Sequence, residues 1–230
     1  MRTLPVSVFL AGLLTLSTVL SAQETPPPDF PADVAALDAL AREYRSKNMP
    51  TELASLAAHV SAKYATDKAA GQIDWNQWLP LVTHLGTSLN QQTRDQMAQD
   101  LVASLASSAE VISHLGGARL YAIGNCLRAI GHLARAQQVT ASWFSDAARF
   151  DNEPVESLAG LNVFVSDATV RQKLIEALTR RCFATVDIAK QVPLPTLSQL
   201  GWAVARDLPP ETKAEWSAKV RAAYFGASGT

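Results

Sequence analysis

The sequence predicts an all-α protein, because helical spacing, helix-forming composition and a lack of strand signals agree. From Pro31 onward, apolar residues recur at steps of three and four, as in the series Val34, Leu37, Leu40 and Tyr44. This spacing places each series on one face of an α-helix. Alternating strand patterns and Asn-Gly or Asp-Gly hairpin signals are absent, whereas alanine, the best helix former, is abundant. We therefore expect about nine to eleven short antiparallel helices.

Five further series along the chain follow the same spacing and predict further helices. They are Leu53, Leu56, Val60 and Tyr64; Trp75, Trp78, Val82 and Leu85; Leu120, Ile123, Leu127 and Ile130; and Val170, Leu174 and Leu178, followed by Trp216, Val220 and Tyr224 near the end. Residues able to cap or begin a helix stand where helices should start. These are Thr51, Asp74, Ser108 and Asp167 as caps, and Pro154, Pro209 and Pro210 as first-turn prolines. Gly71, Gly86 and the Gly116–Gly117 pair indicate stops or breaks.

Three segments of the chain share an approximate pattern of polar start and apolar helical face. Residues 89–105 align with 208–224 at an offset of 119, and more loosely with 166–182 at an offset of 77. Both offsets are near multiples of about 40, the period of helix-pair repeats. The stretch from about 75 to 225 thus resembles a HEAT-type α-solenoid. This resemblance implies a helical-repeat array, and an irregular helix bundle is the alternative architecture.

The first residues have the layout of a secretory signal peptide. Arg2 supplies a positive start, Val6 to Leu20 form an apolar run, and Ser21–Ala22 are small residues suited to cleavage. Leu20-Ser21-Ala22 matches the start of a bacterial lipobox, but Gln23 stands where a cysteine would receive the lipid. We therefore expect residues 1–22 to be a cleaved signal and the protein to be periplasmic or secreted.

The remaining chain divides into a short linker, one domain and a tail. Residues 23–31 contain four prolines and predict an extended linker. We expect a single all-helical domain over 32–225 and a flexible tail over 226–230. The apolar fraction of 48% is close to the globular average, which allows a sizeable core.

The charge of the chain argues against nucleic acid and an anionic membrane surface as partners. The apolar run at 6–20 is too short and too rich in Ser and Thr to favour stable membrane insertion. The formal net charge is −1, from 20 basic and 21 acidic side chains, and neither sign is segregated. Arg180-Arg181 ends a predicted helix, where cations complement the helix dipole. The chain has two cysteines, Cys126 and Cys182. They could form a disulfide or remain as two buried free thiols. Neither has a nearby base that would make it a nucleophile.

Three glycines predict a close helix contact. Gly117, Gly124 and Gly131 are seven residues apart and would form one nearly straight groove on a helix. Glycine costs about 0.5–1 kcal/mol inside a helix, so we expect a neighbouring helix packed closely against this groove. A ligand in the groove is the functional alternative.

The sequence contains no recognised catalytic, phosphate-binding or calcium-binding motif. His59, His84, His114 and His132 are scattered, which does not favour a zinc site. Glu110 and His114 are four residues apart and so share one helical face. They suit an ordinary surface pair, and the alternatives are a shared metal ion or an acid and its base. The carboxylate pairs Asp146 with Asp151 and Glu153 with Glu156 suit first-turn positions, and the aromatic pairs Trp75 with Trp78 and Trp143 with Phe144 suit a core.

These observations favour a non-enzymatic, exported helical scaffold that binds a protein or peptide partner. No catalytic residue, no metal ligand and no cofactor is expected, and the sequence does not indicate which residues bind. The alternative is an enzyme or small-ligand-binding protein with a pocket between helices, built from residues distant in sequence.

Overall fold

The computed structural model describes residues 29–106, 112 and 114–225. Within these residues it contains α-helices and short 3-10 helices and no strand, which confirms the all-α prediction. Several expectations fall on residues outside the described part. These are the signal peptide at 1–22, linker residues 23–28, Ser108, Glu110 and the tail at 226–230.

Twelve α-helices make up the described chain, one more than the largest number expected. The additional elements are short, since α8 has 4 residues and α11 has 6, too few for a repeating apolar series. The α-helices are α1 (Val34–Ser46), α2 (Pro50–Ala69), α3 (Trp75–Leu85), α4 (Gln91–Ala106), α6 (Gly117–Ala129), α7 (Leu133–Ala141), α8 (Arg149–Asn152), α9 (Val155–Leu161), α10 (Ala168–Cys182), α11 (Val186–Gln191), α12 (Leu194–Asp207) and α13 (Pro210–Phe225). The 3-10 helices are η1 (Gly86–Ser88), η2 (Trp143–Ser145) and η3 (Asn162–Phe164).

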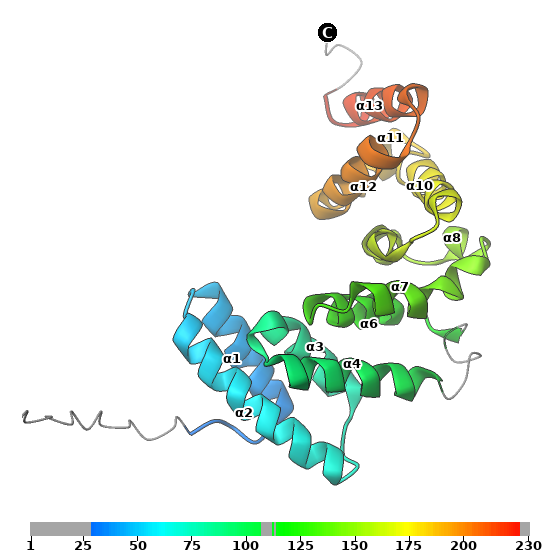
Figure 1. Ribbon diagram of the computed structural model, residues 1–230. Helices are drawn as coiled ribbons and strands as arrows, with labels where there is room; N and C mark the ends of the chain where they lie inside the picture. The colour runs from blue at the N-terminus through cyan, green and yellow to red at the C-terminus, as the bar shows by residue number, and fades with distance from the viewer. Residues whose placement is uncertain (1–28, 107–111, 113, 226–230) are drawn as a thin grey trace, which may run out of the picture.

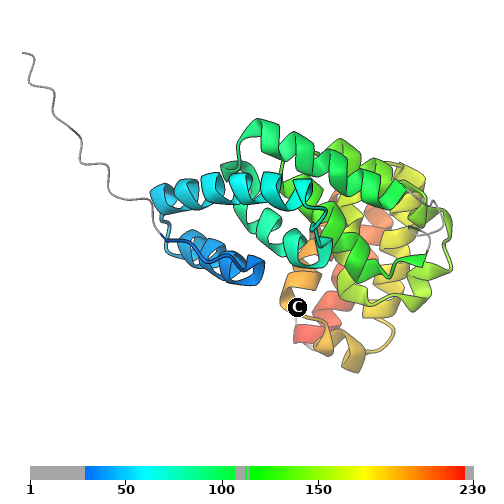
Figure 2. The ribbon, with the colours of Figure 1, turned by 90° about the horizontal axis from the view of Figure 1, so that it is seen from below.

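The helices follow one another through space in the order of the sequence (Figure 1). One row runs through the molecule, because α1 packs on α3, α3 on α6, α6 on α9, and α9 on α12. On the other side α4 packs on α7, while α10 contacts α8, α9 and α12. Seen from below, α1 and α2 extend to one side of the later helices, which lie behind one another (Figure 2). Helices near in sequence are therefore neighbours in space.

One hydrophobic core runs along the whole array. It begins at Val34 in α1 and continues to Ala223 in α13 without dividing into separate clusters. Trp78 and Trp143 are among its largest fully buried side chains, as the sequence predicts. The indole Nε1 of Trp143 donates to the carbonyl of Leu115 at 2.9 Å, so the buried ring leaves no unpaired donor.

The predicted helix starts are right where an acidic cap is present. The Asp74 side chain accepts from the amide of Asn76, and that of Asp167 accepts from the amide of Val170, both at 2.9 Å. Thr51 is not a cap, because α2 already begins at Pro50, whose missing N–H is harmless in a first turn.

The expectation of a glycine groove is right for two glycines and wrong for the third. A Cβ atom at Gly117 would lie 3.3 Å from the Cβ of Ser157 on α9, so α6 and α9 approach closely there. Gly124 meets the ring of Phe164 in the same interface. Gly131 is not in the groove, because α6 ends at Ala129 and Gly131 adopts a φ of +88° in the turn that follows.

The three similar sequence segments correspond to α4, α10 and α13. Each segment begins two residues before its helix and ends in the last turn of that helix, so the pattern marks a polar turn and the helix that follows it. The intervening α7 lacks the pattern. A solenoid built from equal repeats remains a prediction.

Candidate functional site

The most exposed large apolar side chains belong to one helix. On α12, Trp202 is 78% exposed and Leu194 is 74% exposed. Successive residues of an α-helix are about 100° apart, so Leu194, Pro195, Ser198, Trp202 and Ala205 share one sector of about 100°. All five are exposed and none is charged. We call these five residues the α12 stripe.

The opposite side of α12 is anchored in the core. Thr196, Leu200, Ala203 and Val204 are buried, and α12 packs on α9, α10 and α13. In Figure 1, α12 lies at the margin of the array, with these helices on the remaining sides. The stripe is thus an outward-facing surface on a helix that is held from behind.

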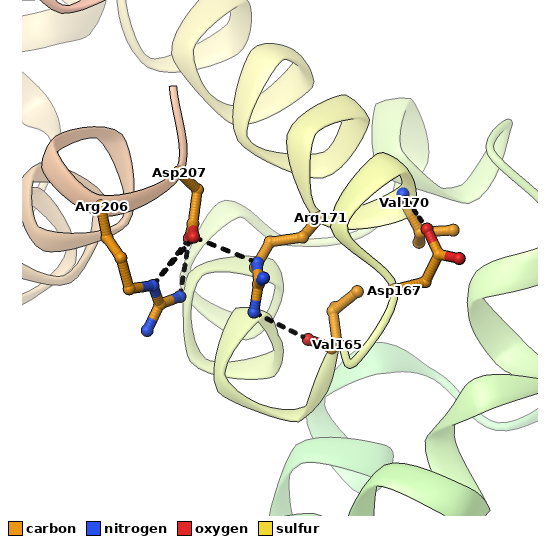
Figure 3. A network of polar contacts seen from close by, with 6 residues as sticks. All are labelled: Val165, Asp167, Val170, Arg171, Arg206 and Asp207. Carbon is orange, nitrogen blue, oxygen red and sulfur yellow. Dashed lines mark hydrogen bonds and ion pairs between the residues drawn. The ribbon is translucent and has the colours of Figure 1, made fainter. Parts of the chain in front are cut away.

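A polar network fixes the end of α12 against α10 (Figure 3). The Asp207 side chain, only 10% exposed, accepts three hydrogen bonds from Arg206, the shortest from Nη2 at 2.7 Å. Arg171 of α10 approaches the same carboxylate, with Nε 3.3 Å from Oδ1, and donates from Nη1 to the carbonyl of Val165 at 3.2 Å. The Arg171 contact is an ion pair, because its Nε is not aligned for a hydrogen bond. Hydrogen bonding to Asp207 raises the pKa of Arg206, so this guanidinium group stays charged.

A second candidate site is a pocket of about 250 Å³ between α3 and α6. Asn76, Pro80, Thr83 and His84 of α3 line it, together with Arg119 and Asn125 of α6. Among the described residues that line the pocket, none is acidic. The pocket therefore has one permanent positive charge, that of Arg119.

The histidine in this pocket is held by a carboxylate from another helix. His84 Nδ1 lies 2.6 Å from Oδ1 of Asp38 on α1, whose side chain is 11% exposed. Arg42 of α1 approaches the other oxygen of Asp38, with its Nε 3.3 Å away. An ionised carboxylate only accepts hydrogen bonds, so we assign the proton of this contact to Nδ1. His84 and Asp38 are 46 residues apart, and no local sequence pattern indicates that they pair.

The other histidines do not gather into a site. His132 Nε2 lies 3.0 Å from Oδ1 of Asp95, and His59 packs against Phe30 with ring centroids 5.0 Å apart. His114 is exposed, and its expected partner Glu110 lies outside the described residues. In the part of the chain that the structure describes, no group of three or more His, Cys, Asp or Glu could hold a metal ion.

The carboxylate pairs considered from the sequence have structural roles. Glu153 accepts from the amide of Gly117 at 2.8 Å and so caps the start of α6, a distant helix. Asp146 accepts from the amide of Ala148 at 3.0 Å, and Asp151 pairs with Arg180. Asp146, Asp151 and Glu153 thus each have a polar partner of their own.

Both cysteine side chains are buried free thiols. Burial raises the pKa of Cys126 to about 12, although a hydrogen bond with Thr83 opposes the shift. Burial likewise raises the pKa of Cys182 to about 11. Because the thiolate is the nucleophile, such thiols are unreactive near neutral pH.

Sequence reasoning placed Trp75, Trp78, Trp143 and Phe144 in the core, and the structure buries all of them wholly or in part. It missed Trp202. A usable signal was present, because Leu200 and Val204 mark the buried side of their helix and Trp202 follows Leu200 by two residues, about 200° around the axis.

Among the described helices, none combines the length and the apolar character needed to cross a bilayer. Comparison with known proteins adds no relative: no protein-family model, no curated protein and no solved structure matches the chain.

Proposed function

We propose that this chain is a non-enzymatic exported protein that binds a protein or peptide partner through the α12 stripe. The observation that carries the proposal is the 78% exposure of Trp202 within an uncharged, largely apolar surface. Tryptophan is among the residues most enriched where protein interfaces gain their binding energy. Depletion of charge at the centre of a patch is also typical of interfaces.

The way α12 is held supports this proposal. A recognition surface loses less entropy on binding when its scaffold is already rigid. The buried side of α12 packs on three helices, and the ion pair of Arg171 with Asp207 ties its end to α10. Export to the periplasm or the medium, proposed from residues 1–22, would place the stripe among extracytoplasmic proteins.

An enzymatic function has less support. The His84–Asp38 contact resembles half of a catalytic arrangement, but Thr83, the hydroxyl residue beside His84, donates to the carbonyl of Leu79 at 2.7 Å. Both thiols are buried and have raised pKa values. No described side chain in this pocket is a nucleophile placed beside its base.

The test compares partner capture by the wild-type protein with that by two variants. The wild-type protein is immobilised and exposed to a periplasmic extract and a culture extract of the native organism. The protein that it captures is then purified, and its affinity for the wild-type protein and for each variant is measured. Trp202→Ala should weaken binding about 30-fold or more, since a hot-spot residue contributes at least ~2 kcal/mol. Leu133→Ala removes another exposed apolar side chain, 43% exposed on α7, and should leave affinity unchanged.

Two outcomes would refute the proposal. One is a captured partner that binds wild type and Trp202→Ala equally well. The other is turnover of a substrate that depends on His84 and occurs without any captured partner, which would establish the enzyme alternative.

A further inference from the structure

The pocket between α3 and α6 contains a cation, Arg119, for which the described part of the chain shows no ion-pair partner. Arg119 is half-buried and lines the pocket, and among the described residues no carboxylate lies within ion-pair distance of it. A planar guanidinium matches a carboxylate in two parallel hydrogen bonds. An anionic group that enters this pocket would meet a positive charge and no competing acid from the described lining.

His84 adds a second polar group without adding a negative charge. Its Nδ1 donates to Asp38 at 2.6 Å, which fixes the ring and leaves Nε2 as the second polar atom. Asp38 does not repel an anion strongly, because Arg42 balances its charge from the far side at 3.3 Å. Asn125 contributes a donor as well, since Arg128 donates to its Oδ1 at 2.6 Å and its amide hydrogens remain available.

Pro80 leaves one backbone carbonyl of α3 without its usual helical partner. It stands inside α3 and has no N–H, so the carbonyl of Asn76 lacks the hydrogen bond that residue i+4 normally donates. A helix carbonyl points along the axis toward residue i+4, and Asn76 and Pro80 both line the pocket. The Asn76 carbonyl, without its usual helical partner, is therefore the backbone acceptor that we consider beside the donors for an anion.

We propose that this pocket binds a peptide carboxylate together with an adjacent N–H group. Arg119 and Asn125 hold the carboxylate, His84 forms the polar wall beside it, and the carbonyl of Asn76 accepts the N–H. The volume of about 250 Å³ is below the ~300–1,000 Å³ of pockets for drug-sized ligands, so it suits one acidic side chain or a chain terminus. The site is separate from the α12 stripe, and it can bind whether or not Trp202 has a partner.

The test uses small probes and the whole purified protein in calorimetric or NMR titrations. N-acetyl-glutamate α-amide carries a side-chain carboxylate, and N-acetyl-alanine carries a terminal carboxylate. N-acetyl-glutamine α-amide is the neutral counterpart of the glutamate probe. At least one of the two carboxylates should bind about tenfold or more tightly than the neutral probe. Whichever binds better identifies the source, an acidic side chain or a C-terminus.

Two variants and a control identify the binding atoms. Arg119→Gln should lower the affinity for the carboxylate probe about tenfold or more. Arg221→Gln, which removes an exposed arginine on α13, should leave this affinity unchanged. Pro80→Ala restores the N–H that pairs with the Asn76 carbonyl. It should reduce the advantage of N-acetyl-alanine over propionate, which has the carboxylate but no N–H.

Equal binding of the glutamate and glutamine probes would overturn the proposal, and so would unchanged binding by a folded Arg119→Gln variant. Failure of both carboxylates to bind at millimolar concentration would also overturn it. An unchanged advantage of N-acetyl-alanine in Pro80→Ala would refute the role of the Asn76 carbonyl. None of these results depends on Trp202, so they leave the α12 proposal to its own test.

Discussion

The ring of Phe164 lies against Gly124 so closely that a Cβ atom at position 124 would be 2.7 Å from Phe164 Cε2. The contact is reciprocal, because Tyr121 of α6 covers Gly160 of α9, where a Cβ atom would be 2.6 Å from the Tyr121 ring. The two rings are neighbours, with centroids 6.3 Å apart. Each helix thus contributes one glycine, and the partner element fills the space above it with a ring.

Gly124→Leu should therefore destabilise the protein by several kcal/mol. Overpacking alone costs about 1–3 kcal/mol, and here both a ring and a helix must move. Chemical denaturation measures the change in the free energy of unfolding. Ala118→Leu, on the exposed side of the same helix, is the matched control and should be nearly neutral. An equal effect of both substitutions would mean that the close contact of Gly124 with Phe164 does not limit stability.

The sequence was sufficient for the fold class, because periodicity reports which side of each helix is buried. It was insufficient for Gly131, since seven-residue spacing does not show where a helix ends. A glycine after the last turn and a glycine within the groove have the same spacing. The prediction that Thr51 caps a helix was wrong for a similar reason, because α2 begins at Pro50 without a side-chain cap.

The candidate sites were harder to predict than the fold. The contact of His84 with Asp38 joins residues 46 positions apart, and only the packing of α1 on α3 brings them together. Trp202 was predictable in principle from the helical arrangement around Leu200. Tryptophan most often belongs to a core, however, as Trp78 and Trp143 do here, so composition alone does not identify the exposed one.

Asp207→Asn should lower the free energy of unfolding by about 1–3 kcal/mol. The substitution leaves the Arg171 side chain, 24% exposed, without its carboxylate. Asp187→Asn, in the first turn of α11, removes the same charge from an exposed position and serves as control. Thermal and urea unfolding measure both. A stable Asp207→Asn variant would show that packing alone holds the end of α12.

Asp100 should contribute to unfolding in acid. Burial alone would raise its pKa, but hydrogen bonds from Lys68 at 2.6 Å, Tyr64 at 2.7 Å and Gln96 at 3.0 Å lower the pKa overall. A carboxylate with a lowered pKa stabilises the fold above its unfolded pKa of about 3.8 and loses this contribution as pH falls further.

The free energy of unfolding should therefore decrease as pH falls below about 4. Asp100→Asn should show a shallower decrease over this range, measured by urea titrations at successive pH values. Asp187→Asn again supplies the control. A wild-type slope that matches the Asp100→Asn slope would contradict the role of this carboxylate.

The buried thiols predict the opposite behaviour in alkali. At pH 8 the native protein should not react with a thiol reagent, while denaturant without reductant should expose two reactive thiols, because Cys126 and Cys182 are free. A disulfide would instead give no reactive thiol under those conditions. The ordinary thiol pKa of 9.0 rises on folding to about 12 for Cys126 and about 11 for Cys182, mainly through burial.

A group whose pKa is raised by folding contributes stability below its unfolded pKa and loses it as pH rises toward the folded value. The free energy of unfolding should thus fall from about pH 9 upward. Burial and the contact with Asp100 also raise the pKa of Tyr64, so wild type combines thiol and phenol contributions. Cys126→Ala separates them, since it keeps the phenol and removes the more deeply buried thiol. Its unfolding free energy should fall less steeply above pH 9 than that of wild type, and identical slopes would show that Cys126 does not ionise on unfolding.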